Sequence, residues 1–139
     1  MNKEQFIEEL KKYLYDKCKN SYSVEEIDEG LAARSNGIQG YLNLLEDNEY
    51  SSVEEALEQA KEDFRLVFSI LTYEEFKQEV INKLKSQMIF EHRENVKVES
   101  IVSKDLRAID EEYKKAKESG DYFHAVGRSF SYYYYGFLY

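Results

Sequence analysis

Apolar residues recur at helical spacing along most of the chain. In residues 3–19 they fall three and four positions apart, which places them on one face of a helix: Phe6, Ile7, Leu10, Tyr13, Leu14 and Cys18. The same spacing predicts helices over 24–46, 53–71, 73–88, 104–119 and 121–139. The sequence therefore predicts a mainly α protein, a compact bundle of about five to six helices that forms a single domain over 1–139.

Several short motifs mark where these helices begin. Ser23-Val24-Glu25-Glu26 has the capping-box pattern, in which a serine oxygen accepts from the third helical amide and a glutamate reaches back. The same chemistry recurs at Ser52-Val53-Glu54-Glu55 and Thr72-Tyr73-Glu74-Glu75, and more weakly at Asn2 with Gln5. Gly120 is a natural helix stop, and Asp121 can cap the helix that follows.

Two segments leave alternatives open. Gly30, Ala33, Gly37 and Gly40 form a row of small residues within 24–46, and glycines inside a helix cost roughly 1 kcal/mol each relative to alanine. We infer close backbone approach by a neighbouring helix, with a helix break at Ser35-Asn36-Gly37 as the alternative. Val96-Lys97-Val98-Glu99 alternates between apolar and polar residues, so one short β-hairpin near residues 89–102 is plausible.

Charge is distributed unevenly along the chain. The net charge is −9, and residues 21–63 alone hold twelve acidic residues against Arg34 and Lys61. We expect this acidic segment to dock on a basic protein partner, the alternative being a solvated face that keeps the chain soluble. Glu54, Glu58 and Glu62 favour docking, because like charges four apart oppose helix formation. The twelve residues are Glu25, Glu26, Asp28, Glu29, Glu46, Asp47, Glu49, Glu54, Glu55, Glu58, Glu62 and Asp63.

The last predicted helix is aromatic and holds only two charged residues, Asp121 and Arg128. A helix that is apolar on nearly all sides is either central to a core or in contact with a partner. Tyr132, Tyr135 and Tyr139 lie away from its main apolar face, and tyrosine is enriched at interfaces. An alternative function is therefore a structural or assembly protein that self-associates, for example as a homodimer, through this helix.

Catalytic and cofactor-binding motifs are missing from the sequence. Asp121 and His124 could share a helical face, but no further His or Cys completes a metal site, and no nucleophile elbow or phosphate loop is present. We expect no catalytic, cofactor or metal residues and no enzyme activity; a small hydrolase or metal enzyme centred on Asp121 and His124 is a third hypothesis.

Composition also bears on partners and location. The lysines within 11–19 and 114–117 are accompanied by acidic residues, which argues against direct binding of nucleic acid. No stretch approaches the ~20 apolar residues of a membrane helix. Cys18 is the only cysteine, and the first residues do not resemble a signal peptide, so we expect a cytoplasmic protein.

In size, acidity, Lys/Glu/Asn/Tyr-rich composition and lack of catalytic motifs, the whole chain resembles the small phage-encoded inhibitors of bacterial defence, anti-CRISPR proteins among them. The resemblance implies a Cas effector or related nuclease as the partner, in the bacterial host cell. It also implies that the chain blocks this partner by occupying its nucleic-acid or PAM-reading surface. No individual residue receives a role from this resemblance.

Overall fold

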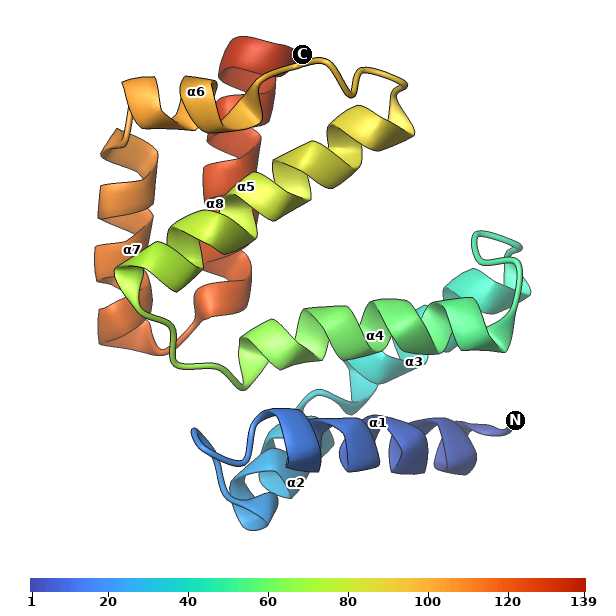
Figure 1. Cartoon of the computed structure of the whole chain (residues 1–139). Helices are drawn as coiled ribbons and strands as arrows, with labels where there is room; N and C mark the ends of the chain where they lie inside the picture. Colours follow the sequence, from blue (N-terminus) through green and yellow to red (C-terminus); the bar gives the residue numbers. More distant parts are fainter. The chain divides into compact units, whose positions relative to one another are not determined.

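The structure, a computed structural model, describes all 139 residues as helices joined by turns, without a β-strand (Figure 1). The predicted all-α class is confirmed, but eight α-helices and one π-helical turn replace the expected five to six helices. The chain forms two compact units, residues 1–69 (unit 1) and residues 70–139 (unit 2). Each unit is described by itself, and the single domain over 1–139 stays a prediction.

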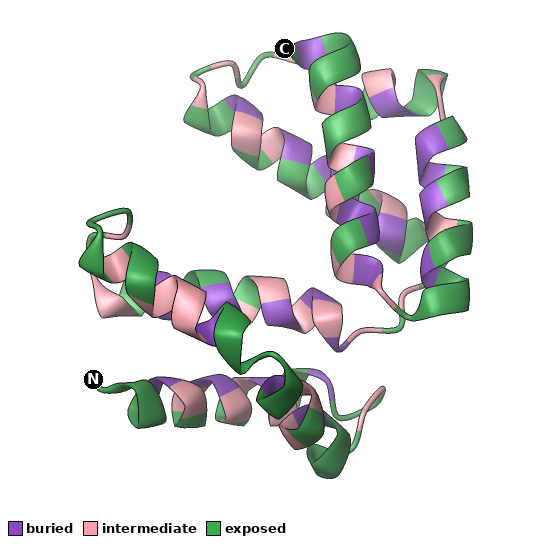
Figure 2. Cartoon of the chain, turned by 180° about the vertical axis from the view of Figure 1, so that it is seen from behind, coloured by how far each residue is buried: buried purple, intermediate pink, exposed green.

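Unit 1 consists of four helices around an apolar core. Helix α4 packs against α1 and α3, and α1 packs against α2. Figure 2 shows buried positions along one side of these helices, as the helical spacing predicts. The helices are α1 (Lys3–Lys17), α2 (Val24–Ala33), α3 (Ser35–Glu46) and α4 (Val53–Val67). The core contains Phe6, Leu10, Leu14, Cys18, Ile27, Leu31, Ile38, Ala56, Leu57, Ala60, Phe64 and Phe68.

The helix starts predicted from capping motifs are confirmed. Complete capping boxes form at Asn2, Ser23 and Thr72, each with the predicted residue three positions later. Ser52 caps α4 through the amide of Glu55, but the Glu55 carboxylate turns to the amide and hydroxyl of Ser51 instead of closing the box.

One continuous helix over 24–46 is wrong, because the chain breaks at Arg34, directly before the Ser35-Asn36-Gly37 break given as the alternative. Helix α2 packs on α1, whereas α3 packs mainly on α4 and also on α1. The chain therefore changes direction between α2 and α3. The inferred approach of a neighbouring helix along the small residues is also wrong. A Cβ added at Gly37 or Gly40 would meet no atom within 4 Å, whereas one at Gly30 would lie 2.5 Å from the Phe68 ring.

Unit 2 is also helical, with α5 and α7 packed against α8, and α6 packed on α5. Its helices are α5 (Tyr73–Phe90), α6 (Val98–Lys104), α7 (Arg107–Ser119), α8 (Tyr122–Tyr133) and the π-helical turn η1 (Tyr134–Leu138). The core contains Phe76, Val80, Ile81, Leu84, Met88, Val98, Val102, Ala108, Ile109, Ala116, Tyr122, Ala125, Val126, Tyr133 and Leu138. No helix in either unit has both the length and the apolar character that crossing a membrane requires.

The predicted hairpin near residues 89–102 is wrong. Helix α5 ends in a turn in which His92 has a left-handed φ of 58° and Arg93 N–H donates to Met88 O at 2.7 Å. Val98 and Val102 are both buried on α6, and their spacing of four residues is helical, so the alternation of residues 96–99 was too short to indicate a strand. The predicted helix over 104–119 begins at Arg107 instead, after α6 ends.

The predicted last helix is present but changes its winding near the end. Gly120 adopts a left-handed φ of 77°, and the Asp121 carboxylate accepts from His124 N–H at 3.0 Å, as predicted. Helix α8 places Tyr122, Val126 and Tyr133 in the core, so α8 packs its inner face against the rest of unit 2. The chain then changes to the wider π-helical winding of η1, where Tyr139 N–H donates to Tyr134 O at 2.6 Å.

Candidate functional site

The excess negative charge of the chain belongs to unit 1. Unit 1 holds sixteen acidic and eight basic side chains, whereas unit 2 holds twelve and eleven. All twelve predicted acidic residues lie in unit 1. Asp28 and Asp63 are half-buried, and the other ten are exposed. Which of these carboxylates are free, and which are bound within the fold, decides what the surface can do.

Three free carboxylates lie in the turn after α3. Glu46, Asp47 and Glu49 are exposed and form no ion pair. The last turn of α3 holds no basic residue, so these charges meet the negative end of the helix dipole without compensation. Asn48 holds the turn in shape, with a left-handed φ of 62° and its N–H donating to Leu45 O at 3.1 Å. The arrangement opposes helix stability and leaves three carboxylates available.

A hollow of about 590 Å³ lies where α1 and α4 begin, and it is lined by more carboxylates. Glu4, Glu8 and Glu54 form no ion pair, while Glu9 is paired with Lys12 at 3.3 Å. The sequence analysis missed the three residues on α1, because residues 1–20 carry almost no net charge. The spacing of Glu4 and Glu8, four apart, was the available signal.

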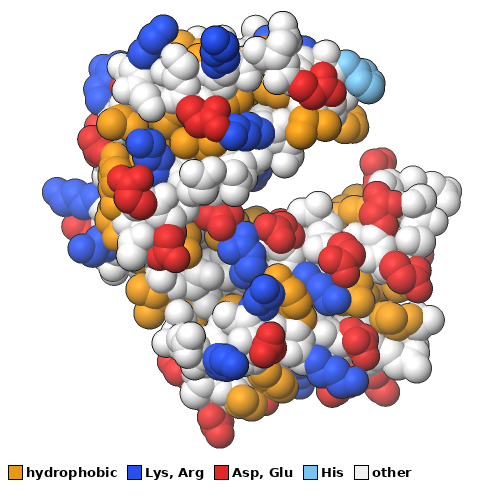
Figure 3. Space-filling model, in the orientation of Figure 1, with side chains coloured by type: hydrophobic (Ala, Val, Ile, Leu, Met, Phe, Trp, Pro, Cys, Tyr) orange, Lys and Arg blue, Asp and Glu red, His pale blue; other side chains and the backbone are white.

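These two groups lie at the same end of unit 1. In Figure 1, α1 and α4 both begin on the side where the turn between α3 and α4 lies, and Figure 3 shows acidic side chains gathered at that end. We call this surface the acidic end; its free carboxylates belong to Glu4, Glu8, Glu46, Asp47, Glu49 and Glu54.

The remaining predicted residues on α4 are bound to neighbours. Glu58 pairs with Lys61 at 3.2 Å, and Glu62 pairs with Arg65 at 2.8 Å. Hydrogen bonds from Ser51 lower the pKa of the Glu55 carboxyl, which stays ionised as part of the α4 cap. The stripe Glu54, Glu58 and Glu62 is therefore partly neutralised by basic residues three positions on.

Asp28 and Asp63 join helices within unit 1. The Tyr15 hydroxyl donates to Asp28, joining α1 to α2, and the Tyr41 hydroxyl donates to Asp63, joining α3 to α4. Asp63 also accepts from Gln59 Nε2 at 2.9 Å. Both carboxylates are half-buried, so we assign them to the fold and not to the free acidic surface.

The acidic residues of α2 form a separate group. Glu25 and Glu29 are exposed without an ion pair, and Glu26 closes the capping box with Ser23. Their neighbour Asp28 contacts Tyr15, which lies roughly 16 Å along α1 from Glu4 at about 1.5 Å per residue. The twelve predicted residues therefore do not form one surface: four lie at the acidic end, four lie on α2, and the other four are bound along α4, namely Glu55, Glu58, Glu62 and Asp63.

No family model, curated protein or solved structure matches the chain. The assignment of function therefore rests on the residues of the chain itself.

The three predicted tyrosines occupy different environments in unit 2. The Tyr132 hydroxyl donates to Asp105 Oδ2 at 2.7 Å and accepts from Arg107 at 3.2 Å, so it joins α8 to the end of α6 and the start of α7. Tyr135 and Tyr139 are exposed, with their rings 5.4 Å apart. Tyr132 is 39% exposed, against 65% and 88% for Tyr135 and Tyr139, so the latter two are the more accessible.

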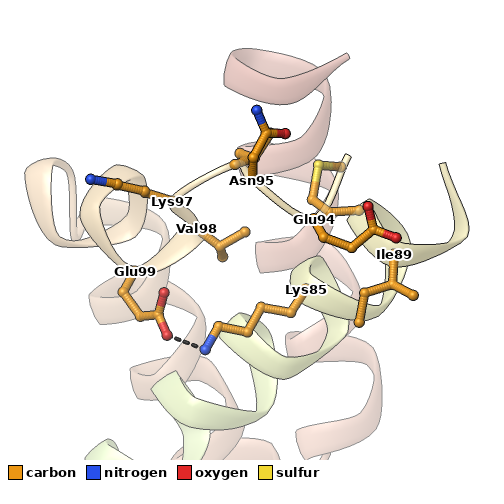
Figure 4. Close-up of a pocket in the computed structure, with 9 residues that line it drawn as sticks. Lys85, Ile89, Glu94, Asn95, Lys97, Val98 and Glu99 are labelled. Carbon is orange, nitrogen blue, oxygen red and sulfur yellow. Dashed lines mark ion pairs between the residues drawn. The ribbon is translucent and has the colours of Figure 1, made fainter. Parts of the chain in front are cut away.

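A second hollow, of about 360 Å³, lies between α5 and the start of α6 (Figure 4). Its apolar wall includes the buried Met88 and Val98, and the ion pair between Lys85 and Glu99 spans it. No buried side-chain polar atom in the chain lacks a hydrogen-bond partner, so no orphaned group points into this hollow. We assign it no ligand.

Asp121 and His124 form a helix cap. The His124 ring Nδ1 lies 2.7 Å from Asp121 Oδ2, in addition to the backbone bond of the cap. Burial raises the pKa of Asp121, but the hydrogen bonds from His124 outweigh it and lower the pKa overall. No group of three His, Cys, Asp or Glu side chains is placed to hold a metal ion. The pair is explained by the start of α8.

Proposed function

We propose that the chain is a non-enzymatic inhibitor or adaptor whose acidic end docks on a basic, nucleic-acid-binding protein. The observation that supports this most is the placement of Glu46, Asp47 and Glu49, exposed and unpaired at the wrong end of a helix dipole. Features that break a local stability rule without compensation are expected at functional positions.

The free carboxylates of the hollow extend this surface. Glu4, Glu8 and Glu54 line a concave region that could accept a lysine or arginine side chain of the partner. A surface of this kind competes with nucleic acid, because DNA carries about one negative charge per ~1.7 Å of helix axis and is held by the same basic residues. The compositional resemblance to anti-CRISPR proteins makes a Cas effector or related nuclease the partner class to test first.

The test begins with capture of a partner from bacterial lysate treated with nuclease, at low and at high salt. We expect a basic nucleic-acid enzyme that is bound at low salt and released at high salt, because exposed charges are screened over ~8–10 Å at physiological ionic strength. The captured protein is then purified, and its binding to DNA is measured with increasing amounts of the chain. Stoichiometric loss of DNA binding is the expected result.

Two matched variants locate the surface. The triple variant Glu46→Gln, Asp47→Asn and Glu49→Gln should weaken binding roughly tenfold or more. The control, Glu94→Gln, Glu111→Gln and Glu118→Gln, removes the same charge from exposed carboxylates of unit 2 and should bind like the parent chain. Equal affinity of the two variants, or capture of no basic protein at either salt concentration, would contradict the proposal.

A further inference from the structure

The π-helical turn η1 gathers three tyrosine rings of unit 2. In an α-helix, residues five positions apart point about 140° away from one another, so Tyr134 and Tyr139 would lie on different sides. In η1 the Tyr139 N–H donates to Tyr134 O, and the wider winding leaves the two ring centroids 5.9 Å apart. The Tyr135 ring contacts both, with its centroid 5.0 Å from Tyr134 and 5.4 Å from Tyr139. We call these three residues the tyrosine cluster.

The end of α5 holds the tyrosine cluster in place. The Tyr134 hydroxyl donates to Glu91, and the same ring stacks on Phe130 at 5.4 Å. Arg93 donates to Leu138 O at 2.6 Å, which ties η1 to the turn after α5 at a second point (Figure 1). Rings that are ordered before binding lose little conformational entropy when a ligand arrives.

The rings are inclined to one another and open to solvent. Tyr135 and Tyr139 are mostly exposed, and the three ring planes meet at 83°, 66° and 50°. A cation is attracted to the face of an aromatic ring when it lies within ~6 Å of the centroid. Because the centroids are 5.0 to 5.9 Å apart, one cation on the solvent side can lie within that distance of all three.

The charges beside the tyrosine cluster favour a cation. The turn after α5 carries Glu91, Arg93 and Glu94, a net charge of −1, and the Arg93 charge is paired with Glu91 at 3.1 Å. Lys83 already lies over the Phe130 ring, 5.1 Å from its centroid, so the neighbouring ring attracts a cation from within the chain.

Hydrogen bonding indicates which cation fits. A lysine ammonium carries three donors that need acceptors. The Glu91 carboxylate, which is bonded to the tyrosine cluster, already accepts from Gln87, Arg93 and Tyr134. A quaternary ammonium group donates no hydrogen bond, so it loses none on leaving water, and aromatic rings are the side chains that recognise it.

We propose that the tyrosine cluster binds a quaternary ammonium group, such as that of choline or of a trimethylated lysine side chain. The ring faces supply the attraction, and the π-helical winding supplies their arrangement. This inference does not rest on the proposed function, because it uses no residue of unit 1.

The test follows the tyrosine resonances of the whole chain by NMR at constant ionic strength. The probes are choline, its neutral isostere dimethylbutanol, and one short peptide that carries either trimethylated or unmodified lysine. We expect saturable choline binding with a Kd on the order of 10 mM or below, and binding of dimethylbutanol roughly tenfold weaker. The trimethylated peptide should bind more tightly than the unmodified one. Whichever of choline and the trimethylated peptide binds more tightly identifies the source of the group.

Variants then locate the site. Tyr135→Leu and Tyr139→Leu should each weaken choline binding roughly two- to fivefold, the contribution of one exposed ring, whereas Tyr135→Phe keeps the ring face and should bind like the parent chain. The control Phe137→Leu removes an exposed ring that contacts Tyr132 and Tyr133 instead, and it should bind like the parent chain.

Four results overturn the inference. They are the absence of saturable choline binding, equal binding of dimethylbutanol and choline, equal binding of the two peptides, and unchanged choline affinity in Tyr135→Leu and Tyr139→Leu. All these substitutions lie at exposed positions, so the variants keep the fold and the comparison stays valid.

Discussion

The turn after α3 in unit 1 and the contact between α7 and α8 in unit 2 hold their carboxylates differently. In unit 1, Glu46, Asp47 and Glu49 are exposed and unpaired, whereas in unit 2 Glu112 is buried and binds Arg128 Nε at 2.6 Å and Lys115 at 3.4 Å. Asp105 likewise accepts from Arg107 and Tyr132, and the bonds from Arg107 hold its pKa well below the usual range. The difference teaches that acidity alone does not define a binding surface: a carboxylate with partners belongs to the fold, and one without partners is available.

The largest expected change in the free energy of unfolding comes from a variant that tests the bound carboxylates of unit 2. Arg128→Met keeps the apolar stem but leaves buried Glu112 with Lys115 as its only cation. We expect a loss of about 2–3 kcal/mol in the free energy of unfolding, below the ~3–5 kcal/mol of a fully buried pair because Lys115 remains. Urea unfolding followed by circular dichroism measures it, and Glu111→Gln is the control on the exposed face of α7. A loss under ~0.5 kcal/mol, the size typical of an exposed pair, would show that Glu112 needs no partner.

The next effect concerns close packing in unit 1. Gly30→Ala forces a Cβ to within 2.5 Å of the Phe68 ring, which is itself buried beside Phe64 and Tyr22. We expect a loss of about 1–3 kcal/mol from overpacking. Gly40→Ala, which meets no neighbour, should instead gain up to ~1 kcal/mol through helix propensity. Equal melting temperatures for the two variants would contradict the close contact at Gly30.

A pH-dependent effect tests the hydrogen bonds between tyrosine and aspartate in unit 1. The bond to Asp28, with burial second, raises the pKa of Tyr15 to about 12 from its ordinary value. Because the folded pKa is the higher one, this stabilisation is complete below about pH 10 and is lost as pH rises toward 12. The parent chain should lose stability across this alkaline range more steeply than Tyr15→Phe. Parallel curves in alkaline urea titrations would show that this bond contributes nothing.

The smallest effect is a gain in stability. The variant Glu46→Gln, Asp47→Asn and Glu49→Gln relieves repulsion at the negative end of α3 and should raise the free energy of unfolding by about 0.3–1 kcal/mol at low salt. The gain should shrink as salt screens the charges. Thermal unfolding at two ionic strengths measures it, and a loss of stability would mean that these side chains support the turn.

Local patterns were sufficient to predict the helix starts that carry a side-chain cap. The capping residues Asn2, Ser23 and Thr72 were predictable because the donors and acceptors of a cap lie within four residues of one another. The sequence offered a break at 35–37 only as an alternative to one long helix, because the choice depends on the different packing partners of α2 and α3. The hairpin prediction failed for a similar reason: Val98 faces the core through helical spacing that four residues of alternation concealed.

The candidate site was predictable only in part. The unpaired acids of residues 46–49 follow from sequence, since no basic residue is near them. The hollow at the start of α1 depends on two helices beginning side by side, which no local signal encodes. The roles of Asp28 and Asp63 depend on tyrosines 13 and 22 residues away, so sequence alone could not separate them from the free acids.

Cys18 gives unit 1 a chemical reporter of its own. The thiol is 3% exposed at the end of α1, burial raises its pKa, and it is the only cysteine of the chain. A thiol reagent can reach it only when this part of unit 1 opens, so the labelling rate follows the free energy of that opening. Labelling kinetics can therefore follow the stability of unit 1 separately from that of unit 2 without introducing a probe.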